Sequence, residues 1–163
     1  MEKLLEEMQT PSTTVTVTLL SDPHDIPYPD GAQAVKNTEV TVATRYRARC
    51  TGIGCIAEIG DKVFLVSDSF APCVPIIVFN ANGAWLAHSF GLSGVDQVRK
   101  VAIAHNDCDI IISKKHARSA QIARAIFEQL GEFSVQLLDV DISGTIGVVV
   151  SAVSKTILVY RQT

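Results

Sequence analysis

The sequence predicts an α+β fold in which mainly antiparallel or mixed β-sheets pack as a sandwich flanked by one or two helices. Most of the segments alternate between apolar and polar residues or are rich in β-branched residues, as strands are. One long segment, residues 114–130, instead has apolar residues at helical spacing. The 163 residues, of which 47% are hydrophobic, suffice for one core without disulfide bonds. We therefore expect a single domain over residues 1–163.

The chain begins with a segment that we expect to be a short N-terminal helix or arm, residues 1–12. Residues 13–20 alternate and are rich in threonine and valine, which predicts a strand. Residues 21–39 contain three prolines and an Asp-Gly pair, which predict a long loop. Loops of this length are often functional.

The middle of the chain predicts strands separated by glycine-containing turns. In order they are residues 40–50, 55–59, 63–66, 74–79, 84–88, 98–104 and 109–113. Residues 55–59 and 63–66 are expected to form a hairpin, and the glycines of residues 51–54 indicate a bulge. Residues 90–96 are rich in glycine and serine and predict a loop.

The C-terminal part predicts the main helix and three final strands. Ser113 can cap a helix over residues 114–130, and Gly131 is a natural end for it. The strands are residues 133–140, 146–153 and 156–160, and a tight turn near Ser154-Lys155 joins the last two.

Charge and hydropathy exclude several classes of partner. The net charge of −3 at pH 7 predicts neither nucleic acid nor a membrane as a partner. No apolar run reaches the roughly 18 residues of a membrane helix. The acidic N-terminus has no signal-peptide apolar region, so we expect a cytoplasmic protein or one secreted by a signal-peptide-independent route.

The four cysteines are expected to be reduced thiols, since no signal peptide directs the chain to an oxidising compartment. Cys50 and Cys55 have a spacing that could bind a metal, but no second cysteine pair completes a tetrahedral set. The nearest alternative ligands are His105 and Cys108. We therefore predict neither a metal site nor a cofactor.

The chemistry that the sequence suggests is centred on Cys73 and His88, which lie on two predicted strands joined by a turn. A cysteine attacks as its thiolate, and enzymes place it beside an imidazole whose charged form lowers the thiol pKa. If the turn spans residues 80–83, Pro75 faces His88, and Cys73 is the diagonal neighbour of His88 on the same face. A tighter turn at Asn82-Gly83 would instead place Ile77 opposite His88.

Further groups complete this hypothesis. Cys73 would lie at a strand mouth, because Pro75 lacks an N–H and delays regular pairing. Ser67 is our first choice to orient the imidazole, with Asp68 and Ser69 as alternatives. The backbone N–H groups of Cys73 and Val74 could form an oxyanion hole.

The alternative interpretation is that Cys73 is a core residue. Cysteine is among the most buried residue types, and one flanked by proline and valine usually packs in a core. On that interpretation His88 is a buried strand residue, and the protein is a non-enzymatic β-rich binding or assembly domain.

The stretch from Ser67 to Gly91, which contains Cys73 and His88, resembles the cysteine-histidine glutamine deamidases of the cytotoxic necrotizing factor and chemoreceptor deamidase type. Cys73 opens a strand, and the second strand ends with Gly-Ala-x-x-Ala-His over residues 83–88, as in that family. Ser67 stands where the chemoreceptor enzymes have a threonine that supports the histidine. Ala71-Pro72 stands where the family has Gly or Ser before the cysteine. The glycine-rich approach to Cys55 resembles the chemoreceptor motif as well, which makes Cys55 a rival nucleophile.

The resemblance implies a β-sandwich flanked by helices and a hydrolase, a protein-glutamine deamidase that acts through a thioester at Cys73 and needs no cofactor. The partner would be a protein that presents a glutamine side chain. The chain would then be a bacterial toxin or effector, a virulence factor that modifies a host protein. A related thiol protease or transglutaminase would use the same acyl-enzyme.

Overall fold

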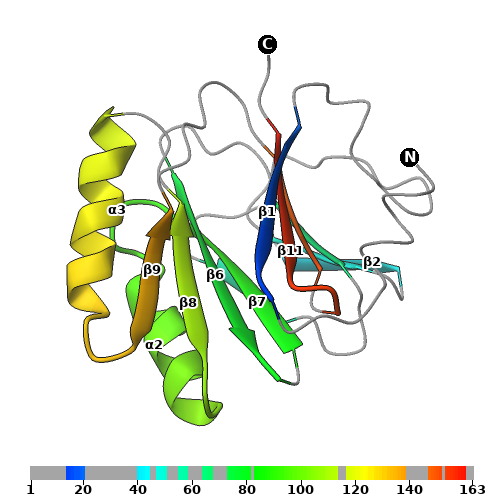
Figure 1. The fold of residues 1–163 in the computed structure, drawn as a ribbon, viewed down its shortest axis with the longest axis horizontal. Helices are drawn as coiled ribbons and strands as arrows, with labels where there is room; N and C mark the ends of the chain where they lie inside the picture. Colours follow the sequence, from blue (N-terminus) through cyan, green and yellow to red (C-terminus); the bar gives the residue numbers. More distant parts are fainter. Residues whose placement is uncertain are drawn as a thin grey trace.

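A computed structural model describes residues 14–20, 40–44, 47–50, 55–58, 64–67, 73–81, 83–113, 117–138, 147–151 and 153–160. These residues form two mixed β-sheets and two helices, so the predicted α+β class is confirmed (Figure 1). The predictions for residues 1–12, 21–39 and 51–54 lie outside the described residues. Among the helices described, none is long and apolar enough to span a membrane.

The six-stranded sheet, called sheet A, comprises β1 (Thr16–Leu20), β2 (Val40–Thr44), β3 (Arg47–Cys50), β5 (Phe64–Ser67), β10 (Gly147–Ser151) and β11 (Thr156–Tyr160). Its strand order is β1-β11-β10-β5-β3-β2. β10 and β11 form the antiparallel hairpin that the sequence predicts. β1 pairs in parallel with β11, so strands from opposite ends of the described chain are neighbours.

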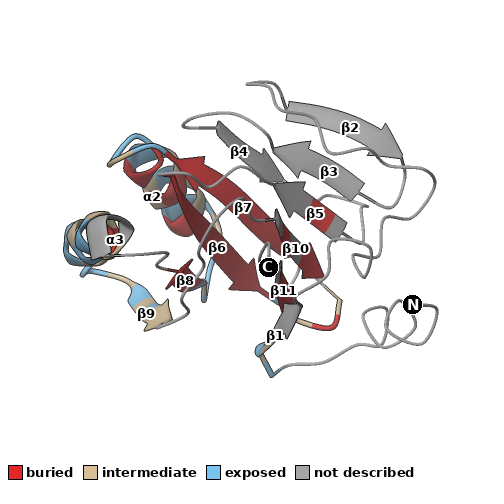
Figure 2. Cartoon of the chain, turned by 90° about the horizontal axis from the view of Figure 1, so that it is seen from above, coloured by how far each residue is buried: buried red, intermediate tan, exposed pale blue. Residues whose placement is uncertain are grey.

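The five-stranded sheet, called sheet B, comprises β4 (Cys55–Glu58), β6 (Val74–Asn80), β7 (Gly83–Ser89), β8 (Asp109–Ser113) and β9 (Ser134–Leu138). Its order is β4-β7-β6-β8-β9. Every residue of β6 and β7 is buried, which explains why these strands are almost continuously apolar (Figure 2).

The molecule has three layers, because sheet B is covered on both faces. The core between the two sheets combines residues of sheet A with residues of sheet B: Leu65, Val148, Val150, Ile157 and Val159 from the first, Ile77, Phe79, Ala84, Leu86 and Ile111 from the second. The helices α2 (Val95–Ala104) and α3 (Ala117–Gln129) cover the other face of sheet B (Figure 1). The predicted sandwich with flanking helices is therefore present.

The strand expected at residues 98–104 is wrong, because these residues belong to α2. Val95, Val98 and Ala102 are its buried residues, and their spacing of three and four is helical. The helix begins inside the segment that we expected to be a loop. The run Val-Ala-Ile-Ala suggested a strand because short apolar runs do not distinguish the two structures.

The hairpin expected between residues 55–59 and 63–66 is also wrong. β4 pairs with β7 in sheet B, whereas β5 pairs with β3 and β10 in sheet A. The chain therefore changes sheets between these two strands. Their alternation is compatible with either partner, since it sets which face is buried and not which strand is the neighbour.

Candidate thiol-imidazole site

The β6–β7 hairpin has the register that brings Cys73 and His88 closest. Pro75 is paired with His88, and Phe79 is paired with Ala84. Pairing continues one step further to Asn80 and Gly83. The tighter register is excluded, because Ile77 is paired with Leu86.

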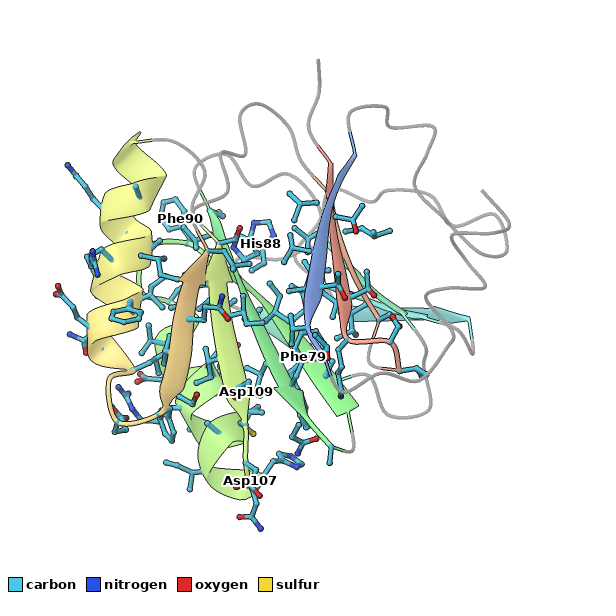
Figure 3. All side chains as sticks on the ribbon, viewed as in Figure 1. Phe79, His88, Phe90, Asp107 and Asp109 are labelled. Atoms are coloured by element: carbon cyan, nitrogen blue, oxygen red, sulfur yellow. The ribbon has the colours of Figure 1, made fainter. Side chains whose placement is uncertain are left out.

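Cys73 and His88 share the face of sheet B that looks toward sheet A. Cys73 immediately precedes β6, and its side chain packs in the core between the sheets with Ile77 and Leu86. His88 follows Leu86 by two residues on β7, so it points to the same side. Figure 3 shows His88 between the two sheets. The two side chains are diagonal neighbours, for which Cα atoms are roughly 7 Å apart.

Both side chains are buried. Cys73 is 5% exposed and His88 is 3% exposed. We expected an accessible thiol at a strand mouth, and the structure instead places it in the core between the sheets. Regular pairing begins at Val74 and includes Pro75, whereas we expected it to begin after Pro75, and sheet A covers the thiol.

Burial also determines the charge of His88. Desolvation lowers the pKa of His88 from 6.5 to about 4, so the imidazole is neutral at neutral pH. A neutral imidazole cannot stabilise a thiolate as a cation does. It can accept a proton from a thiol during attack; its low pKa makes it a weaker base than an ordinary imidazole and, once protonated, a stronger acid than an ordinary imidazolium. The resting pair is thus a thiol and an imidazole.

Ser67 is the last residue of β5, where its backbone is paired with Val148. β5, like β3 and β10, is a strand of sheet A that contacts β7, the strand that carries His88. The alternatives Asp68 and Ser69 lie outside the described residues.

The residues expected to form an oxyanion hole lie at the start of β6. Val74 is the first residue of the strand and is paired with Ser89. Its side chain packs on the helix-facing side of sheet B, opposite to the side of Cys73. The backbone of residues 73 and 74 is therefore adjacent to the thiol.

Cys55 is closer to His88 in the sheet than the sequence suggested. β4 is the other neighbour of β7, and Cys55 is paired directly with His88. Directly opposite residues are roughly 5 Å apart, against roughly 7 Å for diagonal ones. Sequence reasoning missed this pairing because it assigned β4 to a hairpin with β5, and nothing local in the sequence indicates β7 as its partner.

The arrangement separates the two cysteine positions from each other. β7 lies between β4 and β6, so Cys55 and Cys73 are on opposite sides of His88. Two strand spacings amount to roughly 9.5 Å. A disulfide needs Cα atoms within about 7 Å, so this pair cannot close without backbone movement.

The part of the chain that the structure describes contains no group of three or more His, Cys, Asp or Glu residues able to hold a metal ion. No protein-family model matches the chain, and no curated protein sequence matches it either. The site is therefore interpreted from its own residues.

Proposed function

We propose that this protein is a protein-glutamine deamidase, with Cys73 as nucleophile and His88 as proton carrier. The observation that carries the proposal is the pairing of Pro75 with His88. This register brings a thiol and an imidazole to one face of sheet B at the end of the hairpin, as the resemblance to the deamidases implies.

The reaction uses only these residues and water. The Cys73 sulfur attacks the carbon of the glutamine amide while the thiol proton moves to His88. The imidazolium then protonates the departing nitrogen, ammonia leaves, and a thioester remains. Water attacks the thioester, His88 takes its proton and returns it to the sulfur, and glutamate is released. Ser67 would orient the imidazole, and the N–H groups of Cys73 and Val74 would stabilise the oxyanion.

The burial of the site favours a carboxamide side chain as the substrate. Cys73 has only 5% of its surface exposed, so a bulky main-chain segment has little access to the sulfur. A glutamine side chain is narrow and ends in the reactive group. Deamidation is therefore favoured over proteolysis, while a transglutaminase would share the first half of the reaction.

Two other interpretations have specific support. Cys55 is the alternative nucleophile, because it is paired directly with His88. The non-enzymatic alternative, a β-rich binding or assembly domain, is favoured by the position of Cys73 among the core residues between the sheets.

The biological output of a deamidase would be a new carboxylate on a partner protein that presents a glutamine. We propose a toxin or effector that acts in this way on a host protein after secretion by a signal-peptide-independent route.

The test is the rate at which each cysteine reacts with 2-chloroacetamide, a small reagent whose carboxamide resembles that of glutamine. We expect His88→Ala to slow alkylation of Cys73 by about a hundredfold at neutral pH, because the proton acceptor is lost. Cys108, which is half-buried and contacts the His105 carbonyl oxygen at 3.3 Å, is the internal control and keeps its rate.

Peptide mapping distinguishes the outcomes. If Cys73 reacts only when the protein unfolds, the deamidase proposal fails and the binding domain replaces it. If Cys55 is the cysteine whose rate depends on His88, the nucleophile has been assigned to the wrong side of β7.

A further inference from the structure

Two exposed apolar side chains lie two and four residues after His88 in the sequence. Among the described residues, the large hydrophobic side chains that are exposed are Phe90 at 52%, Leu92 at 47% and Ile103 at 69%. Val74 and Ser89 form the last residue pair of the β6–β7 hairpin. Cys73 lies just before this pair in the chain, and Phe90 lies just after it, so both residues are at the same end of the hairpin. Figure 3 shows Phe90 at the same end of sheet B as His88, far from Phe79 and Asp109.

The loop that carries these side chains is held by its own hydrogen bonds. The buried hydroxyl of Ser89 donates to the Gly91 carbonyl oxygen at 2.8 Å and accepts from the Gly94 N–H at 3.0 Å. The Phe90 N–H donates to the Ser93 hydroxyl at 3.0 Å, and the Ser93 N–H donates to the Phe90 carbonyl oxygen at 3.1 Å. Phe90 and Leu92 are thus presented on an ordered loop, which reduces the entropy lost when a partner binds.

The loop is also uncharged. No ionisable side chain occurs between His88 and Asp96. The Asp96 carboxylate accepts a hydrogen bond from Arg99 at 3.1 Å, and Arg99 also binds Glu132 at 3.0 Å. Asp96, Arg99 and Glu132 together carry one excess negative charge, whereas the loop itself carries none, so the loop offers an apolar contact and not an ionic one.

We infer that Phe90 and Leu92 determine substrate specificity by holding an apolar side chain that lies near the target glutamine of the substrate protein. This inference rests on the proposed deamidase function, since the apolar pair is assigned to the substrate by its position beside Cys73 and His88. Single exposed hydrophobic residues are common on protein surfaces. Here two lie on one ordered loop at the end of the hairpin that carries the reacting groups.

The test uses short synthetic peptides with one central glutamine, which carry either leucine or serine at the neighbouring positions. Ammonia release is measured for the wild type and for the double variant F90S/L92S. We expect the wild type to prefer leucine-flanked peptides by about tenfold in kcat/KM, and the double variant to lose that preference. The wild-type preference should persist at high salt, because no ion pair contributes to it.

Ile103→Ser is the matched control, because it removes an even more exposed apolar side chain from α2 and should keep the preference. Equal rates for leucine- and serine-flanked peptides, or an unchanged preference in F90S/L92S, would overturn the inference and leave deamidation standing. If no peptide releases ammonia in a Cys73-dependent manner, the deamidase proposal itself fails, and the specificity assignment fails with it.

Discussion

The two ends of the β6–β7 hairpin each enclose an ionisable side chain, and only one of the two side chains stays charged. At the turn end, Lys155 reaches across from the β10–β11 turn of sheet A, and its ammonium donates to the Asn80 carbonyl oxygen at 2.6 Å. The same ammonium lies 5.3 Å from the centre of the Phe79 ring. At the other end, His88 lies in the core between the sheets beside Cys73.

Burial lowers the pKa of both groups, but the consequences differ. The pKa of Lys155 is lowered by desolvation from 10.5, while the nearby Asp109 charge raises it. A lysine begins so far above neutrality that it remains protonated, and its partners compensate for the lost water. Desolvation of His88 starts from 6.5 and removes the charge. The turn end thus holds the sheets together by a charged contact, whereas the other end holds a neutral pair suited to proton transfer.

The largest expected effect is a loss of activity, and it should follow from a substitution at the end of the hairpin that carries Cys73 and His88. We expect Cys73→Ala to lower peptide deamidation at least about a thousandfold, because the attacking atom is lost. The measurement is ammonia release from the glutamine peptides. Cys108→Ala is the control and should retain activity, since this cysteine is at the opposite end of sheet B. If Cys73→Ala retained activity and Cys55→Ala lost it, the nucleophile would be Cys55, which lies on the β4 side of His88.

The next largest effect concerns the free energy of unfolding in acid, which should depend on His88. Neutral His88 contributes stability that is fully present above pH 6.5 and is lost as the pH falls through the folded-state pKa of about 4. The free energy of unfolding should decrease by up to about 3 kcal/mol over this interval. Urea unfolding at a series of pH values measures it.

The control for acid stability is a pair of variants. His88→Leu should flatten the pH dependence, while His105→Asn, which changes a histidine whose ring centre lies 4.4 Å from that of Trp85, should leave the His88 contribution in place. An unchanged acid profile in His88→Leu would mean that another group near the core causes the loss.

The smallest expected effect is a loss of stability, and it should follow from a substitution of Lys155 at the turn end of the hairpin. Lys155→Met removes the hydrogen bond to Asn80 and should lower the free energy of unfolding by about 1 kcal/mol. Lys100→Met, at an exposed position of α2, should change it by less than about 0.5 kcal/mol. Equal stability of the two variants would show that the contact between Lys155 and Asn80 does not hold the sheets together.

The sequence indicated the site's local geometry better than its surroundings. The observed register was one of the two that the turn residues allowed, because hairpin pairing is set by nearby residues and the turn could span residues 80–83 or lie at Asn82-Gly83. The burial of Cys73 and His88 was one of two interpretations that the sequence left open, since sheet A supplies the cover from distant segments. Cys55 was misplaced for the same reason, because its strand pairs with β7 and not with its neighbour in sequence. The helix at Val95–Ala104 was missed because an apolar run fits either structure.

The parallel pairing of β1 with β11 has a consequence for how the protein is made. During synthesis, β6, β7, β8 and α2 can form early from contiguous chain, whereas sheet A lacks β10 and β11 until residues 147–160 have been made. Such distant pairing slows folding. β5, which ends at Ser67, gains its β10 partner only at that late stage. A nascent chain would therefore carry Cys73 and His88 before sheet A can cover them, so the burial of these two side chains is acquired late in folding.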